Sequence, residues 1–349
     1  MTRHATLVDV AQLAGVSRTA ASVALNAGPV SRLSVETVQR VHDAARALGY
    51  RPNPAARDLR RGTTRTVCVI SDEVVITRYA SAMITGALDV AHESGHTLLI
   101  SEANGEPERM RQAVESTLDR RADGLIFALT AARMVELPPL PPLMKVVLLN
   151  ATGSKGEPSV LPAEYEAGSA IATELLQAGH RAIAVLGHPP DDWLRALHTV
   201  TVGTRLNGIR AALRQAGVEP ALRLDATHWE PEIGYELTQQ VLARHRPRVT
   251  ALLCLNDRLA FGAYQALLEH GVSIPGEMSV VSFDDDEIAR HLRPGLTTAG
   301  IPYREMGRRA MTMLLDGEVP DAPVQLPMPV HRRQSVAPPG RTPLPTPLC

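Results

Sequence analysis

From residue 66 onward, short apolar runs alternate with amphipathic segments, and this alternation restricts the fold more than any other feature of the sequence. We predict eight strands in two successive sets, at 66–70, 97–100, 124–129 and 146–150, and at 182–186, 222–225, 251–255 and 279–283. We predict intervening helices at 79–94, 107–121, 165–178, 203–216, 232–245 and 258–270. Strands that alternate with helices form parallel sheets covered by helices. Two sets predict two similar lobes, with one further strand near 328–333.

The first fifty residues have a different pattern, which predicts three short helices. Thr6, followed three positions later by an aspartate, resembles a capping box at the start of the first helix. Gly15 supplies a turn, and Ser17 can cap a second helix that runs to about Leu25. A third helix begins after Ser34. Helix, short glycine turn and helix form the helix-turn-helix pattern, although a helical hairpin in an ordinary core gives the same signal.

The charge distribution separates these two parts of the chain. Residues 1–65 hold ten arginines and four carboxylates, a net charge of +6, whereas the other 26 basic and 33 acidic residues give -7. The formal net charge of -1 hides this asymmetry. A basic segment on an acidic body predicts a head that binds nucleic acid, attached to a separate globular module.

Eight motifs occur in order along residues 5–339. They are TLVDVAQLAGVS at 6–17, LGYRPN at 48–53, RADGLI at 121–126, GHR at 179–181, NDRLAFG at 256–262, VVSFDD at 280–285, LTT at 296–298 and MGRRA at 306–310. Together they closely resemble the lactose/galactose repressor family of bacterial transcription regulators. The resemblance implies an α/β protein with an N-terminal helix-turn-helix head and a two-lobed, periplasmic-binding-protein-like (Rossmann-like) effector domain. It places the head at 1–52, a hinge helix at 53–64 and the effector-binding and dimerisation domain at 65–339. Residues 340–349 lie outside the resemblance, and their proline content predicts a disordered tail.

The same resemblance implies how the head contacts DNA. The second helix of each head of a homodimer would enter the major groove of a pseudo-palindromic operator. Val23 stands where the family often has arginine, so the operator sequence cannot be carried over. Leu59 matches the leucine that the family wedges into the minor groove; the alternative is a leucine that packs on the third helix. The residues matched to DNA contacts are Thr6, Ser17, Arg18, Thr19, Ser22, Val23, Asn26, Asn53 and Leu59.

Polar residues directly after predicted strands point to a ligand site between the lobes, because ligands of parallel sheets sit at the carboxyl ends of the strands. Carboxylates and amides there suit a hydroxyl-rich ligand, and aromatic rings can cover the apolar face of a sugar ring. Asp257 and Asp285 could equally cap the helices that follow. With the family's effector positions added, the predicted ligand residues are Tyr79, Asn150, Arg205, Trp229, Asn256, Asp284 and Tyr303.

Other classes of protein find little support in the sequence. No apolar run is long enough to cross a membrane, and residues 1–4 do not begin a secretory signal, so we expect a cytoplasmic protein. Because the cytoplasm is reducing, we expect its three cysteines to be free thiols. No nucleophile elbow, metalloprotease or P-loop motif occurs. We therefore expect no catalytic residues, cofactor or metal. The three aspartates at 284–286 could hold Mg²⁺, but the sequence has no phosphate-binding loop to accompany them. A solute-binding or sugar-processing protein with a similar body is the alternative.

The effector itself stays open at this point. A sugar is the commonest ligand of the family that the sequence resembles, but a sugar phosphate or a nucleobase is compatible with the same motifs. Both modes of control are also compatible, since the ligand can release the protein from DNA or act as a co-repressor.

Overall fold

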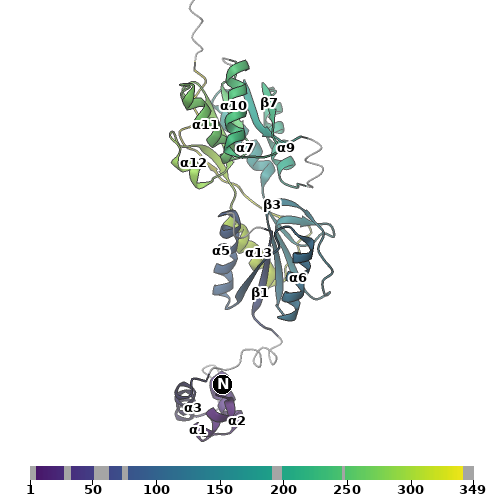
Figure 1. The fold of residues 1–349 in the computed structure, drawn as a ribbon, viewed down its shortest axis with the longest axis vertical. Helices are drawn as coiled ribbons and strands as arrows, with labels where there is room; N and C mark the ends of the chain where they lie inside the picture. Colours follow the sequence, from purple (N-terminus) through teal and green to yellow (C-terminus); the bar gives the residue numbers. More distant parts are fainter. Residues whose placement is uncertain are drawn as a thin grey trace, which may run out of the picture. The chain divides into compact units, whose positions relative to one another are not determined.

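The computed structural model describes residues 5–26, 33–50, 63–72, 78–190, 199–245 and 248–340. The chain divides into two compact units, residues 1–65 and 66–349, which are described separately (Figure 1). The hinge helix predicted at 53–64 lies outside the described residues except for 63 and 64, and the predicted tail lies outside them from residue 341.

The described part of the first unit consists of three helices, α1 (Leu7–Ala14), α2 (Arg18–Asn26) and α3 (Val35–Ala47). The capping box at Thr6 is present, with the Thr6 side chain accepting from the backbone of Asp9 and the Asp9 carboxylate accepting from the backbone of Thr6. Gly15 ends α1 in the left-handed conformation, at φ 64°. Val10, Ala21 and Val41, one from each helix, are fully buried where the helices meet. The predicted helix-turn-helix is confirmed.

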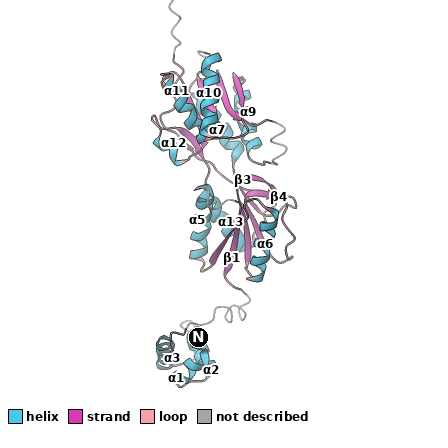
Figure 2. Ribbon diagram, in the orientation of Figure 1, coloured by secondary structure: helices cyan, strands magenta, loops and turns pink. Residues whose placement is uncertain are grey.

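The second unit contains two lobes, each built on a six-stranded sheet (Figure 2). The first lobe has the order β11-β5-β4-β3-β1-β2, with every neighbouring pair parallel. Its strands are β1 (Thr66–Ser71), β2 (Thr97–Glu102), β3 (Gly124–Val135), β4 (Lys145–Gly153), β5 (Ser159–Pro162) and β11 (Val324–Leu326). Its helices are α5 (Arg78–Glu93), α6 (Pro107–Asp119) and α13 (Tyr303–Asp316).

The second lobe repeats this plan with the order β12-β10-β9-β8-β6-β7, in which only β12 runs antiparallel to its neighbour. Its strands are β6 (Ile183–His188), β7 (Leu222–Asp225), β8 (Ala251–Cys254), β9 (Ser279–Asp284), β10 (Thr297–Gly300) and β12 (Val330–His331). Its helices are α7 (Glu164–Gln177), α9 (Val202–Gln215), α10 (Pro231–His245), α11 (Asp257–Glu269) and α12 (Glu287–His291). The predicted two-lobed α/β architecture is confirmed.

The chain passes between the lobes three times. The passages lie between β5 and α7, between β10 and α13, and between β11 and β12. The first lobe therefore includes α13 and β11 from near the end of the chain, and α13 packs into the same core as α5. Ile301, in the second passage, packs against the cores of both lobes.

Pairs of glycines allow three pairs of helices to cross at close range. A Cβ atom built on any of these glycines would lie 1.8–2.2 Å from a carbonyl oxygen of the facing helix, so no larger residue fits. Such contacts let backbones touch where side chains would otherwise hold helices 8–10 Å apart. The pairs are Gly86 with Gly307 (α5 and α13), Gly168 with Gly208 (α7 and α9) and Gly234 with Gly262 (α10 and α11).

The structure differs from the sequence prediction in several elements. β3 continues to Val135, six residues beyond its predicted end, because the residues after 129 pair with β4 in a shifted register. The strand expected at 328–333 is only two residues long. Cys68 and Cys254 are buried free thiols as expected, and Cys349 lies outside the described residues. The elements that were not predicted are β5, β10, β11, α12 and α13.

The glycine contacts predict a sharp contrast within α9. Gly208→Ala should lower the free energy of unfolding by about 1–3 kcal/mol, because the new methyl group overlaps the carbonyl oxygen of Tyr165, 2.0 Å away. Gly203→Ala is the matched control, since nothing lies within 4 Å of its Cβ. Alanine there should leave stability unchanged or raise it by up to about 1 kcal/mol. Urea denaturation followed by circular dichroism measures both; equal effects would contradict the close crossing.

Candidate functional site

A cavity of about 360 Å³ lies between the two lobes and is lined by residues of both. Six of the seven predicted ligand residues line it: Tyr79, Asn150, Arg205, Trp229, Asp284 and Tyr303. The lining residues that sequence reasoning missed are Thr130, Ala131, Ala132, Arg133, Glu164, Thr199, Thr201, Val202, Thr227 and Ile301.

The wall from the first lobe is the irregular segment of β3, held by a buried carboxylate. Asp72, directly after β1, accepts hydrogen bonds from the Thr130 backbone N–H (3.0 Å) and from Arg133 Nη1 (3.2 Å). Asn150 Nδ2 donates to the carbonyl oxygens of Leu129 (2.9 Å) and Thr130 (3.2 Å). An aspartate at position 150 could not make these two contacts, because a carboxylate has no N–H. The register shift in β3 turns this segment toward the cavity.

The wall from the second lobe contains a buried ion pair. Arg205, on α9, donates from Nε and Nη2 to the two carboxylate oxygens of Glu164 at 2.6 and 2.8 Å, and from Nη1 to the carbonyl of Leu255 at 2.6 Å. Both side chains are under 5% exposed. The guanidinium also lies over the ring of Phe283, 4.4 Å from its centroid. Arg205 was predicted to contact the ligand, but in the structure its hydrogen bonds are made to the protein.

Trp229 lines the cavity and is held from two sides. Its indole Nε1 donates to the carbonyl of Gly187 at 2.7 Å. Its own carbonyl accepts from Asn256 Nδ2 at 3.2 Å, while Asn256 Oδ1 caps α11 by accepting from the Leu259 N–H. The Asn256 amide therefore supports Trp229, and Asn256 is not among the residues that line the cavity.

Asp284, at the end of β9, presents a carboxylate in an unusual environment. Its backbone φ of 106° is one that side-chain-bearing residues rarely adopt, and such strain clusters at ligand sites. Its side chain is 13% exposed, with Arg205 Nη2 3.7 Å away. Burial raises the pKa of Asp284 to about 6, against the lowering effect of Arg205, and the carboxylates of Glu164 and Asp286 raise it further. Above that pH the group is a hydrogen-bond acceptor only.

The two acids that could have capped helices do something else. Asp257 is fully buried and accepts from Thr298 Oγ1 at 2.8 Å, from the Asp286 N–H at 2.7 Å and from the Ser282 hydroxyl. Asp285 accepts from Arg333 Nη2 at 2.6 Å. Asn256, next to Asp257, caps α11, and Asp286, next to Asp285, caps α12.

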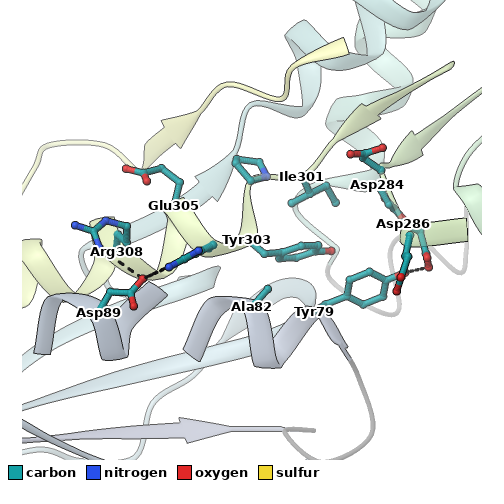
Figure 3. Close-up of a pocket in the computed structure, with 13 residues that line it drawn as sticks. Tyr79, Ala82, Asp89, Asp284, Asp286, Ile301, Tyr303, Glu305 and Arg308 are labelled. Carbon is teal, nitrogen blue, oxygen red and sulfur yellow. Dashed lines mark hydrogen bonds and ion pairs between the residues drawn. The ribbon is translucent and has the colours of Figure 1, made fainter. Parts of the chain in front are cut away.

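Two tyrosines connect the cavity with a second, larger one. The rings of Tyr79 and Tyr303 lie 5.1 Å apart, and Tyr79 Oη donates to Asp286 Oδ2 at 3.2 Å, from the first lobe to the second (Figure 3). The second cavity, of about 700 Å³, shares Tyr79, Asp284, Ile301 and Tyr303 with the first. A second contact between the lobes joins the Val200 N–H to the Ala132 carbonyl at 3.4 Å. Both contacts involve residues in or next to the lining.

In the head, three of the predicted DNA-contacting residues lie exposed on α2. Arg18, Thr19 and Val23 are exposed, whereas Ala21 and Ala24 are buried in the helical core. Ser22 is half-buried, and Ser17 accepts from the Ala20 N–H at 3.1 Å. Thr6 is exposed at the start of α1. Asn53, Leu59 and the side chain of Asn26 lie outside the described residues.

Two features of other classes of protein are absent from the described residues. No described helix is long and apolar enough to cross a membrane. Within the same residues, no three histidine, cysteine or carboxylate side chains are grouped so that they could hold a metal ion.

The two units match two known protein families. Residues 6–53 match bacterial regulatory proteins of the lacI family, and residues 172–336 match the periplasmic binding protein-like domain. The HTH-type transcriptional regulator GalR of Escherichia coli (strain K12) is 33% identical over 319 residues, which are 89% of this chain and 88% of that protein. The chain belongs to the lacI family. It is a DNA-binding transcriptional regulator.

Other members of the family agree with this assignment. The ribose operon repressor of Escherichia coli (strain K12) is 29% identical over 315 residues, 89% of this chain and 92% of that protein. The crystal structure of the lac repressor dimer bound to operator and the anti-inducer ONPF has a TM-score of 0.77 and 25% identity, covering 96% of this chain and 100% of that one. The family resemblance seen in the sequence motifs is therefore confirmed.

The raised pKa of Asp284 predicts how ligand binding depends on pH. If the carboxylate accepts hydrogen bonds from ligand hydroxyls, affinity is full above pH 6 and falls as the pH drops through 6, by up to about tenfold at pH 5. Asp284→Asn should bind roughly 10–150-fold more weakly at pH 7, the range for a charge-assisted hydrogen bond, with a flat profile. Calorimetry with any sugar that binds the wild type measures both. A wild-type profile as flat as that of the variant would exclude this role.

Proposed function

We propose that this regulator is a homodimeric repressor controlled by a small molecule, most simply a sugar, bound in the cavity between the lobes. The cavity carries the proposal, because it combines aromatic rings, threonine hydroxyls and a carboxylate on walls that belong to two lobes. The relatives support it: one is named for repression of a ribose operon, and another was solved as a dimer on operator DNA with a small molecule. We place the protein in the cytoplasm, where its DNA is.

On the DNA side, α2 would lie in the major groove with Arg18, Thr19 and Val23 toward the bases. Arg18 can pair with a guanine edge, and Val23 can contact a thymine methyl group. Ser17, Ser22, Thr6, Asn26 and Asn53 would contact the sugar-phosphate backbone or the neighbouring bases. The hinge, 53–64, would fold on the operator and insert Leu59 into the minor groove.

On the ligand side, control follows from the position of the cavity. A ligand that touches both lobes stabilises one arrangement of them relative to others, and only that difference in affinity can shift the equilibrium. The contacts of Tyr79 with Asp286 and of Val200 with Ala132 join the lobes beside the cavity, so they would form or break with that shift. The first lobe continues directly into the linker, since β1 begins at Thr66. Ligand binding and DNA binding are therefore coupled, reciprocally.

The alternative of a solute-binding or sugar-processing protein is less consistent with the molecule. Such a protein needs only the two lobes, whereas this chain carries a folded three-helix head with the charge of a nucleic-acid-binding segment. We therefore propose that it is not an enzyme, and that the cavity binds its ligand without altering it.

The function is tested with DNA taken from upstream of the protein's own gene. The full chain should shift one fragment in a gel-shift assay, and deletion of residues 1–62 should abolish the shift. A panel of sugars should then contain a member that changes the affinity at least tenfold. The idea would be abandoned if the truncated protein still bound the fragment specifically, or if wild type bound all DNA alike.

The proposed minor-groove wedge gives a separate prediction. Leu59→Ala should weaken operator binding by a few kcal/mol, the scale of one unstacked base step, with non-specific binding unchanged. Leu143→Ala is the matched control, since Leu143 is 95% exposed on the first lobe and far from the head in sequence. Operator affinities from gel-shift titrations decide; identical values for the two variants would rule out the wedge.

A further inference from the structure

The charges inside the cavity are already paired by the protein itself. Of the described residues that line it, four carry full charges: Arg133, Glu164, Arg205 and Asp284. Arg205 is held by both oxygens of Glu164, and Arg133 donates to Asp72 behind the wall. The charged residues of the lining balance, two carboxylates against two guanidinium groups, and Asp72 behind the wall adds a third carboxylate to the described part of the site.

With Arg205 paired, the other guanidinium group of the described lining is that of Arg133, which is 34% exposed and donates to Asp72 from Nη1. A two-point contact between a guanidinium and a carboxylate is the geometry by which proteins also bind phosphate. Glu164 occupies that position on Arg205, the Leu255 carbonyl takes Nη1, and the Phe283 ring covers one face of the group. An anionic ligand that approached Arg205 would have to displace a carboxylate that is 3% exposed or lie against it.

The remaining groups of the lining suit a ligand without charge. Asp284 offers a carboxylate acceptor, and four threonines, at positions 130, 199, 201 and 227, offer hydroxyls that donate and accept. Rings of Tyr79, Trp229 and Tyr303 supply apolar surface for the faces of a sugar or another flat, neutral ligand.

We infer that the cavity selects ligands without an anionic group, and that Glu164 sets this preference by occupying Arg205. This rests on the proposed function, because it narrows the effector to the unphosphorylated form of a sugar or another neutral molecule. Glu164 lies at the first residue of α7, directly after the chain enters the second lobe. Glu164→Gln keeps the size of the side chain and one acceptor for Arg205, and removes the negative charge.

The first experiment needs no effector and uses Trp229 as a reporter. In Trp193→Phe, emission comes from Trp229 alone, which lines the cavity and is partly exposed. Stern–Volmer constants are measured for iodide, caesium and neutral acrylamide at constant ionic strength, each relative to N-acetyltryptophanamide. The normalised Stern–Volmer constant should be larger for caesium than for iodide. Stronger quenching by iodide than by caesium would overturn the inference, with no further variant required.

The same measurement then isolates Glu164. Adding Glu164→Gln should raise the iodide constant about twofold or more, while the acrylamide constant stays the same. Glu166→Gln is the matched control, because Glu166 is exposed on the same helix two residues away, outside the cavity lining. If both variants change iodide quenching equally, Glu164 has no special role.

The second experiment compares ligands in matched pairs. Thermal shifts of the wild type are measured with glucose and glucose 6-phosphate, ribose and ribose 5-phosphate, and fructose and fructose 6-phosphate. No phosphate ester should raise the midpoint of unfolding more than its parent sugar, and Glu164→Gln should reduce the difference for any sugar that binds. A wild type stabilised more by an ester refutes the inference and leaves the proposed function intact. If no sugar binds, the proposed sugar effector fails, and the quenching results still decide the charge of the cavity.

Discussion

The three passages of the chain between the lobes are the constraint on which the rest of the second unit depends. Because α13 and β11 return to the first lobe, neither lobe is a continuous stretch of sequence, and the first cannot complete its core without residues from beyond 300. The same passages build the ligand site. Glu164 follows the first passage directly, and Ile301 and Tyr303 lie in or at the end of the second. The cavity is therefore located where the lobes are covalently joined.

Close helix crossings make each lobe a stiff body. The glycine pairs bring α5 against α13, α7 against α9 and α10 against α11 with backbone in contact, which leaves no room for one helix to slide past another without a clash. Close-packed interiors deform little and tend to move as units. Motion that responds to a ligand is thus directed to the passages and to the contacts beside the cavity, such as the Tyr79 hydroxyl on Asp286.

Sequence reasoning recovered the parts of the molecule that periodic patterns encode. The three head helices and all eight strands of the two predicted sets are present, because each has a cap, an apolar run or, in β7, alternating apolar residues. The elements that were missed are short or start without a side-chain cap: β10 and β11 span four and three residues, and Pro302 precedes α13 without such a bond. In the ligand site, the ends of the predicted strands correctly indicated Asn150 and Asp284, which line the cavity. The role of Glu164 could not be predicted from the sequence, since its partner Arg205 is 41 residues away.

The Glu164–Arg205 pair is better explained by specificity than by stability. Taking two charges out of water costs several kcal/mol for each ion, and apolar pairs of similar volume are often equally stable or more so. A pair that is under 5% exposed and lines a cavity therefore has little reason to persist as a structural brace alone. What an apolar pair could not do is fix the charge and the hydrogen-bonding capacity of the wall. With Arg205 satisfied on Nε, Nη1 and Nη2, the orientation of both side chains is set before any ligand arrives, and the ordering cost of binding falls accordingly.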